Sequence, residues 1–199
     1  MKRSRSIFSL LGCILFILAC GSLPTSEATS VAAAPVAPIT INGTHEVHSD
    51  IKGGDAFAFS GKKIDMVVTF TATSQEDQTM KGTAQVTYVQ SYEFRYEEEG
   101  YEPCLLAWTI EPITWTAELT GRMQQNTDGS ITVVLIANPR EGPSFLQDLS
   151  CEGETSTTPV FDFLGGVLVD GKYRSKFEYL PHPMTSGSHF ETTIMEVVP

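Results

Sequence analysis

Thr83 to Glu97 reads TAQVTYVQSYEFRYE, and the alternation along this stretch decides the fold class. One side of it is apolar and aromatic, interrupted only by Gln90: Ala84, Val86, Tyr88, Tyr92, Phe94 and Tyr96. The other side is polar except for Val89: Thr83, Gln85, Thr87, Ser91, Glu93, Arg95 and Glu97. Successive strand residues point to opposite faces, whereas a helix would scatter these aromatic rings around its axis. The stretch therefore predicts a long, half-buried strand, bent near Gln90 and Ser91.

Similar apolar runs, separated by turn residues, follow from Ile39 to the end of the chain. The clearest predicted strands are 64–72, 105–110, 113–120, 131–137, 160–169, 173–179 and 190–198. Pro112 ends one strand or leaves it at an edge, because proline lacks the backbone donor of a sheet ladder. Asp170-Gly171 predicts a tight hairpin turn. The polar segment 138–158 predicts a long connection, which a disulfide would hold in place.

Strands with one wet and one dry face need a second sheet opposite them, or closure of the sheet on itself. Because no amphipathic helix is evident after the first twenty residues, we expect a single all-β domain over 39–199. The expected architecture is an antiparallel barrel or β-sandwich of about ten strands. The length of the Thr83 strand favours the barrel, with a lipocalin-like architecture.

The N-terminal segment has the order of an export signal. A basic start precedes the apolar run Ile7 to Ala19, which is too short to span a bilayer as a helix. The run closes with Ile17-Leu18-Ala19-Cys20-Gly21, which resembles the lipobox of bacterial lipoproteins. The resemblance implies that 1–19 is a signal peptide and that the Cys20 thiol receives a diacylglycerol. The alternative is ordinary cleavage near Gly21 without a lipid.

A lipid on Cys20 would place the rest of the chain in the cell envelope, outside the cytoplasm and anchored to a membrane. Residues 20–38 are rich in Ser, Thr, Ala and Pro and contain almost nothing large enough to bury. We expect them to form a disordered linker that holds the folded domain away from the headgroups. The leaflet and the oligomeric state stay open.

The charge of the exported part argues against polyanionic partners. The chain has 13 basic and 24 acidic residues, and three of the basic ones precede Cys20 while no acidic one does. The mature chain thus keeps 10 basic and 24 acidic residues, a net charge of −14. Such a charge repels phosphate backbones, so nucleic acid is not an expected partner.

The four cysteines divide by location. Cys13 leaves with the signal and Cys20 is assigned to the lipid, so Cys104 and Cys151 remain. Disulfides persist in exported proteins, and we expect these two to form one. Two free thiols or a metal site are the alternatives. Closing a loop of this length stabilises a fold by about 4 kcal/mol in the chain-entropy model, before any strain is subtracted.

No catalytic or cofactor motif is found, so neither enzymatic chemistry nor a cofactor is predicted. The nucleophile elbow, dinucleotide fingerprint and P-loop patterns are all absent. His45 and His48 are three residues apart in an expected strand, which places them on opposite faces and argues against a metal site. Asn126 and Asp128 before Gly129 resemble part of a calcium loop, but the twelfth position would be Leu135, so a hairpin turn is favoured.

Two charged groups have ordinary interpretations. Glu97, Glu98, Glu99 and Glu102 are most simply a solvated loop at the end of a strand. Lys172, Arg174 and Lys176 form a basic row on the wet side of their strand. We expect these three to face carboxylates on neighbouring strands, with anion binding as the alternative.

The aromatic side of the Thr83 strand offers a candidate binding surface. Buried tyrosine hydroxyls need partners, which suggests a cavity or a partly wet interior. The candidate ligand-lining residues are Tyr88, Tyr92, Phe94, Tyr96 and Trp115. The leading hypothesis is therefore a non-catalytic binding module for a small hydrophobic or sugar ligand, or for another envelope protein. The alternatives are an assembly lipoprotein without a small ligand, an ordinary core beneath the tyrosines, and an enzyme without a local signature.

Overall fold

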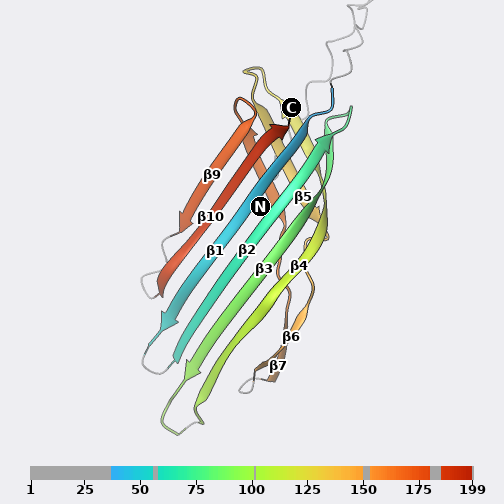
Figure 1. Cartoon of the computed structure of the whole chain (residues 1–199). Coiled ribbons are helices and arrows are strands. Elements are labelled where there is room, and N and C mark those ends of the chain that lie inside the picture. Colours follow the sequence, from blue (N-terminus) through green and yellow to red (C-terminus); the bar gives the residue numbers. More distant parts are fainter. Residues whose placement is uncertain (1–36, 56–57, 101, 150–152, 180–184, 199) are drawn as a thin grey trace, which may run out of the picture. The chain divides into compact units, whose positions relative to one another are not determined.

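The computed structural model describes residues 37–55, 58–100, 102–149, 153–179 and 185–198. Pro35–Pro199 forms one compact unit, and its described part is built of strands (Figure 1). The strands are β1 (Thr40–Gly54), β2 (Ala58–Ser74), β3 (Thr79–Tyr96), β4 (Cys104–Gln125), β5 (Ile131–Asn138), β6 (Phe145–Leu149), β7 (Gly153–Thr157), β8 (Phe163–Leu168), β9 (Lys172–Tyr179) and β10 (Thr185–Val198).

Eight of these strands form one antiparallel sheet in the order β8-β5-β4-β3-β2-β1-β10-β9, and β6 pairs with β7 apart from it. The sheet curls until its two edge strands, β8 and β9, meet at the short turn that joins them (Figure 1). It is therefore nearly closed into a barrel. This confirms the all-β prediction and the preference for a barrel over a sandwich.

The Thr83 strand is part of β3 and has the predicted two faces. Ala84, Val86 and Tyr88 are buried, whereas Thr83, Gln85 and Glu93 are exposed. The register between β3 and β4 shifts between Tyr88 and Gln90, so that one residue of β3 faces two residues of β4. The extra residue lies in β4, and such a β-bulge bends the strand that carries it. The irregularity lies beside the position where the sequence predicted a bend in the Thr83 strand, and that bend itself stays a prediction.

Of the two alternatives expected for Pro112, the end of a strand is wrong and the edge position is confirmed, because β4 pairs with β5 only from Glu118 to Gln125 within the described residues. β4 runs without interruption from Cys104 to Gln125, and Pro112 lies in its bulge between Ile110 and Ile113. A bulge leaves a residue out of the ladder, so the missing N–H of proline costs no hydrogen bond there. The two predicted strands 105–110 and 113–120 are one strand.

The core fills one half of the barrel. Its side chains come from the first part of β1, the second part of β2, the first part of β3, the second part of β4, β5, β8 and the end of β10. The largest of those that are fully buried are Ile41, Met80, Leu119, Leu135, Leu168, Met195, Val68, Val86 and Val133. Burying one aliphatic side chain of this size contributes about 1.5–3 kcal/mol. The other halves of β1 to β4 extend beyond this core, and we call them the open half.

The polar segment 138–158 is more ordered than expected. It contains all of β6 and all of β7, which pair with each other, and Glu141 near its start forms an antiparallel bridge with Val160 just after its end. The Phe161 N–H donates to the Arg140 carbonyl at 2.8 Å, and the Gly142 N–H donates to the Pro159 carbonyl at 2.8 Å. The segment is thus one long hairpin rather than an irregular loop.

The predicted hairpin across Asp170-Gly171 is confirmed only at its turn. Asp170 and Gly171 both have positive φ, 51° and 72°, as a two-residue type I′ turn requires. Val169 and Lys172 exchange backbone hydrogen bonds of 2.9 and 3.0 Å. Beyond that pair the two strands separate, because β8 pairs with β5 and β9 pairs with β10. We call the unpaired line between β8 and β9 the seam.

Candidate functional site

Tyr88 lies in the core rather than in a ligand cavity. It is 6% exposed, and its hydroxyl donates to Gln90 Oε1 at 2.6 Å. Burial raises the pKa of Tyr88 above its ordinary value. Because Gln90 is itself buried, the partner that the tyrosine hydroxyl needs is supplied from within the same strand.

Tyr92, Phe94 and Tyr96 continue the aromatic row beyond the bulge, into the open half, and all three are half-buried. They lie opposite Lys62, Ser60 and Ala58 of β2. The Tyr96 hydroxyl donates to Glu98, which raises the pKa of Tyr96. These rings form an inward-facing aromatic surface next to the filled core, so the sequence placed them correctly on one face.

Trp115 belongs to the same inward face, opposite Val86, but is covered differently. A Cβ placed on Gly142 would lie 3.0 Å from its ring, so the long hairpin passes directly against this tryptophan. Its Nε1 is buried and has no hydrogen-bond acceptor among the described residues. A buried donor without an acceptor is uncommon, and it marks this corner as a place where a ligand or water oxygen would be stabilised.

A polar row from β1 and β10 borders the core on the other side. His45 Nδ1 is 2.9 Å from Thr193 Oγ1, and His189 Nε2 is 3.2 Å from Glu191 Oε1. Burial lowers the pKa of His45 below its ordinary 6.5, and the negative charge of Glu191 opposes this shift in part. The His45 imidazole is therefore held neutral near pH 7.

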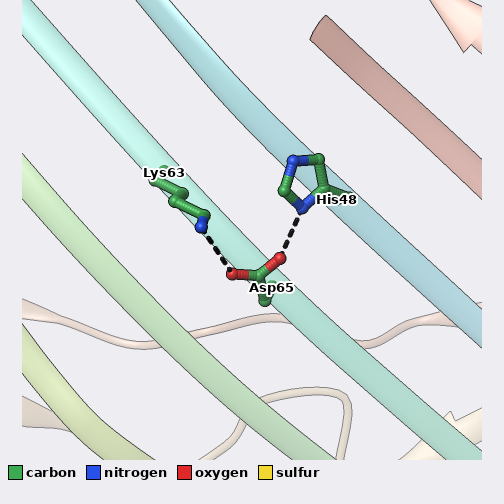
Figure 2. A network of polar contacts seen from close by, with 3 residues as sticks. All are labelled: His48, Lys63 and Asp65. Atoms are coloured by element: carbon green, nitrogen blue, oxygen red, sulfur yellow. Dashed lines mark hydrogen bonds and ion pairs between the residues drawn. The ribbon is translucent and has the colours of Figure 1, made fainter.

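His48 lies on the outward face, as its spacing from His45 predicted. Its Nδ1 is 2.5 Å from Asp65 Oδ1, and Lys63 Nζ is 3.6 Å from Asp65 Oδ2 (Figure 2). The imidazole also stacks on Phe190, with ring centroids 4.9 Å apart. His45 and His48 thus have separate partners on opposite faces, and they do not converge on one ion.

A shallow hollow of about 420 Å³ lies beside this network on the outward face. Gly61 has no side chain to fill it, and its lining includes Asp50, Lys52, Lys63 and Glu93. Charges of both signs surround an open polar depression, so the hollow shows no preference for an anion or a cation.

An exposed apolar surface lies on β5, on β8 and on the residue that follows β8, and the sequence reasoning missed it. Its outward side chains are 39–61% exposed, and we call them the β8 strip: Val134, Ile136, Phe163, Val167 and Val169. The run Phe163-Leu-Gly-Gly-Val-Leu-Val169 has apolar residues on both faces, which was the available signal. The sequence predicted only that 160–169 is a strand of a hairpin, and the edge position of this strand is not visible in the sequence.

The expected partners of the basic row are wrong in part. Lys176 forms an ion pair with Glu178 of its own strand rather than with a carboxylate across the sheet. Lys172 does face Glu196 in the β9–β10 register, and Arg174 faces Ile194. Neither Lys172 nor Arg174 has an ion pair within the described part of the chain. The row is exposed along the edge strand β9.

Two other charged segments have the predicted local structure. The acidic run Glu97, Glu98, Glu99 and Glu102 is exposed between β3 and β4. Asp128 accepts hydrogen bonds from the Ser130 N–H and hydroxyl at 2.9 and 2.6 Å, which lowers the pKa of Asp128. The Asn126 segment is therefore a hairpin turn between β4 and β5, as expected.

Cys104 begins β4, is buried and is disulfide-bonded. Cys151, its expected partner, lies outside the described residues, as do Cys20 and the signal segment 1–19, and the linker 20–38 is described only from 37. The pairing of Cys104 with Cys151 and the lipid on Cys20 stay predictions.

The described domain therefore belongs to the class of small antiparallel β-barrels. Comparison with known protein families, with curated proteins and with solved structures finds no match to this chain. Within the described ranges, no helix is long and apolar enough to cross a membrane.

Proposed function

We propose that this chain is a lipid-anchored, extracytoplasmic binding module that acts by contacting another envelope protein, without catalysis. The observation that carries the proposal is the β8 strip. Phe163, Val167 and Val169 are 57%, 46% and 61% exposed on one face of an edge strand. A contiguous exposed apolar surface at a sheet edge is typical of a protein contact.

The interior of the barrel supports a protein partner over an enclosed small ligand. Large apolar side chains fill the half of the barrel that β5 and β8 help to close. Tyr88, which suggested a wet cavity, is satisfied by Gln90. The exposed apolar area thus lies on the outside of the barrel, where a folded partner can reach it.

The expected lipid anchor on Cys20 supports a location in the cell envelope. The lipobox-like segment ending at Cys20 would hold the domain at a membrane, and the net charge of −14 keeps it away from anionic headgroups. An anchored protein meets its partners in two dimensions, so a contact surface of modest size suffices for association.

A small hydrophobic or sugar ligand on the inward aromatic surface is a second candidate. It is favoured by the half-buried rings of Tyr92 and Phe94 and by the buried Nε1 of Trp115, which has no acceptor among the residues that the structure describes. Sugars bind to such surfaces through stacking on rings together with a few hydrogen bonds. Quenching of tryptophan fluorescence by added glycans or lipids tests this candidate.

The anchor and the contact are tested separately in bacteria that make the full chain. Labelling with an alkyne-tagged palmitate should mark the wild type but not Cys20→Ser; equal labelling of both would contradict lipidation at Cys20. A photocrosslinking residue at Val167 should capture an envelope protein. The same residue at Thr116, exposed on the outward face of β4, should not. Equal capture at both positions, or none at Val167, would contradict the contact surface.

A further inference from the structure

We infer that the free edge of β8 accepts an extended, acidic segment of the partner as an additional strand. This inference rests on the proposed function and names the kind of contact that the β8 strip makes. Four features of the seam carry it: the direction of the unpaired backbone groups, the lack of edge protection on β8, the neighbouring cations, and the charge of the chain itself.

The backbone of β8 presents unpaired groups toward the seam. The Ala137 N–H donates to the Asp162 carbonyl at 2.9 Å, so Asp162 points its backbone groups at β5. In an antiparallel ladder this direction alternates from residue to residue. Phe163, Gly165 and Val167 therefore turn their N–H and C=O groups away from β5 and toward β9.

The same alternation applies on the other side of the seam. Lys172 bonds with Val169 across the turn, so Arg174 and Lys176 also turn their backbone groups toward β8. Val169 and Lys172 are nevertheless the only bridged pair between the two edges in the described chain. Two rows of donors and acceptors thus border the seam without pairing with each other.

β8 lacks the devices that normally protect an edge strand. Phe163–Leu168 contains neither a charged residue nor a proline, and it carries two glycines, which allow another backbone to approach closely. β9, by contrast, carries Lys172, Arg174, Lys176 and Glu178. Because the edge of β8 is unprotected and the edge of β9 is protected, we expect the added strand to pair with β8.

The cations on β9 select the chemistry of the added strand. A strand laid along β8 places alternate side chains outward, between the β8 strip and the row of Lys172, Arg174 and Lys176. Acidic side chains at those positions face cations, of which Lys172 and Arg174 have no ion pair of their own among the described residues. Strand addition uses backbone hydrogen bonds for affinity and side chains for selection.

The net charge disfavours a second copy of this chain as the occupant. Two mature chains of net charge −14 repel each other, whereas a short acidic segment on a partner protein brings its negative charge only to the cationic edge. The inferred occupant is therefore an acidic, extended segment of another protein.

The test uses the purified full chain and two synthetic peptides as long as β8, one of alternating Glu and Val and one of alternating Lys and Val. We expect fluorescence anisotropy to show saturable binding of the Glu-Val peptide and at least tenfold weaker binding of the Lys-Val peptide. Amide hydrogen exchange should slow at Phe163, Gly165 and Val167 when the Glu-Val peptide binds, and these readouts need no variant. Equal binding of both peptides, or unchanged exchange at these amides, overturns the inference.

Val167→Pro removes one donor that faces the seam and leaves the ladder to β5 intact, and Val167→Thr is its matched control. Val167→Pro should weaken binding about five- to tenfold, as for one lost hydrogen bond, and Val167→Thr should not. Circular dichroism verifies that both variants fold. Equal binding by both folded variants contradicts strand addition.

The outcomes also separate this inference from the proposed function. Capture of an envelope protein at Val167, combined with no exchange protection and no effect of proline, retains the proposed function and rejects strand addition. If no protein is captured at Val167 and the Glu-Val peptide does not bind, the proposed function and the strand addition are both rejected. If the wild type self-associates and Val167→Pro does not, a second copy of this chain occupies the edge of β8. That result would overturn the inference of an acidic segment from another protein.

Discussion

The ring of Tyr173 in β9 lies against Gly166 in β8, so closely that a Cβ on Gly166 would be 2.7 Å from Cε1 and Cζ of the ring. Both residues belong to the inward face, since Gly166 is opposite Val133 and Tyr173 is opposite Met195. The contact therefore bridges the seam on the inside, at the end near the turn, where the backbone of the two strands has stopped pairing.

The first prediction concerns this contact. Gly166→Ala should lower the free energy of unfolding by about 1–3 kcal/mol, because the added methyl group overlaps the Tyr173 ring. Urea unfolding measures the change. Gly165→Ala is the control: the added Cβ there meets the tip of Phe163, which is exposed and can move, so the cost should be smaller.

Tyr173→Ala provides the second half of a double-mutant cycle. In that background the cost of Gly166→Ala should largely disappear, since the group it overlaps is gone. If the effects of the two substitutions on the free energy of unfolding are additive, the cost of Gly166→Ala does not come from overlap with the Tyr173 ring.

The second prediction is a pH dependence due to His45. Burial lowers the pKa of His45 in the folded state below its ordinary 6.5, so the unfolded chain binds more protons as the pH falls. The free energy of unfolding should therefore decrease as the pH is lowered through 6.5, and this contribution should level off below the folded-state pKa.

Urea unfolding between pH 8 and pH 5 measures this effect, with His45→Gln as the control, because glutamine cannot take up the proton. The negative charge of Glu191, two residues from the Thr193 that faces His45, reduces the lowering of the His45 pKa, so Glu191→Gln should increase the loss of stability at low pH. Parallel pH profiles for the wild type and His45→Gln would contradict the assignment.

The third prediction concerns the exposed network in Figure 2. His48 and Asp65 are in contact at 2.5 Å, but their side chains are 28% and 44% exposed. Solvent screens such a pair, so the coupling energy from the cycle His48→Ala and Asp65→Ala should be only about 0.2–1 kcal/mol and should fall with added salt. A coupling energy of several kcal/mol would contradict the prediction, because it would mean that solvent screens the pair far less than the exposed fractions of the two side chains indicate.

The fourth prediction concerns the disulfide of Cys104. If Cys151 is the partner, Cys104→Ser and Cys151→Ser should each lower the free energy of unfolding by up to about 4 kcal/mol, and the double variant should lose no more than either single one. Mass spectrometry of unreduced peptides identifies the pair directly. A stable Cys151→Ser variant beside an unstable Cys104→Ser variant would assign another partner to Cys104.

Much of the site could be placed from local patterns. The alternation around Tyr88 assigned the aromatic residues to one face, and the spacing of His45 and His48 assigned these two to opposite faces. Both inferences rest on the period-two geometry of a strand, which operates over neighbouring residues. The Asp170-Gly171 turn was equally local, because it depends on residues that tolerate positive φ.

The errors concern the partner that a residue or segment pairs with, which the alternation of side chains within one strand does not specify. Pro112 was expected to end a strand or to lie at an edge; β4 continues through it by a bulge opposite β3, at a point where β4 is an edge among the described residues. Lys176 was expected to face a carboxylate on a neighbouring strand, but it forms an ion pair with Glu178 of its own strand. Segment 138–158, read as a loop, pairs with itself as β6 and β7.

By itself the sequence determined that this chain forms an acidic all-β domain with one aromatic inner face, because side-chain alternation is set by the backbone within each strand. Only the tertiary structure decided that Tyr88 is satisfied within the core, that β8 is left at an edge, and that the β8 strip is exposed. Which strands become edges depends on the pairing of segments far apart in the chain, and the run Phe163 to Leu168 would look the same in the middle of a sheet.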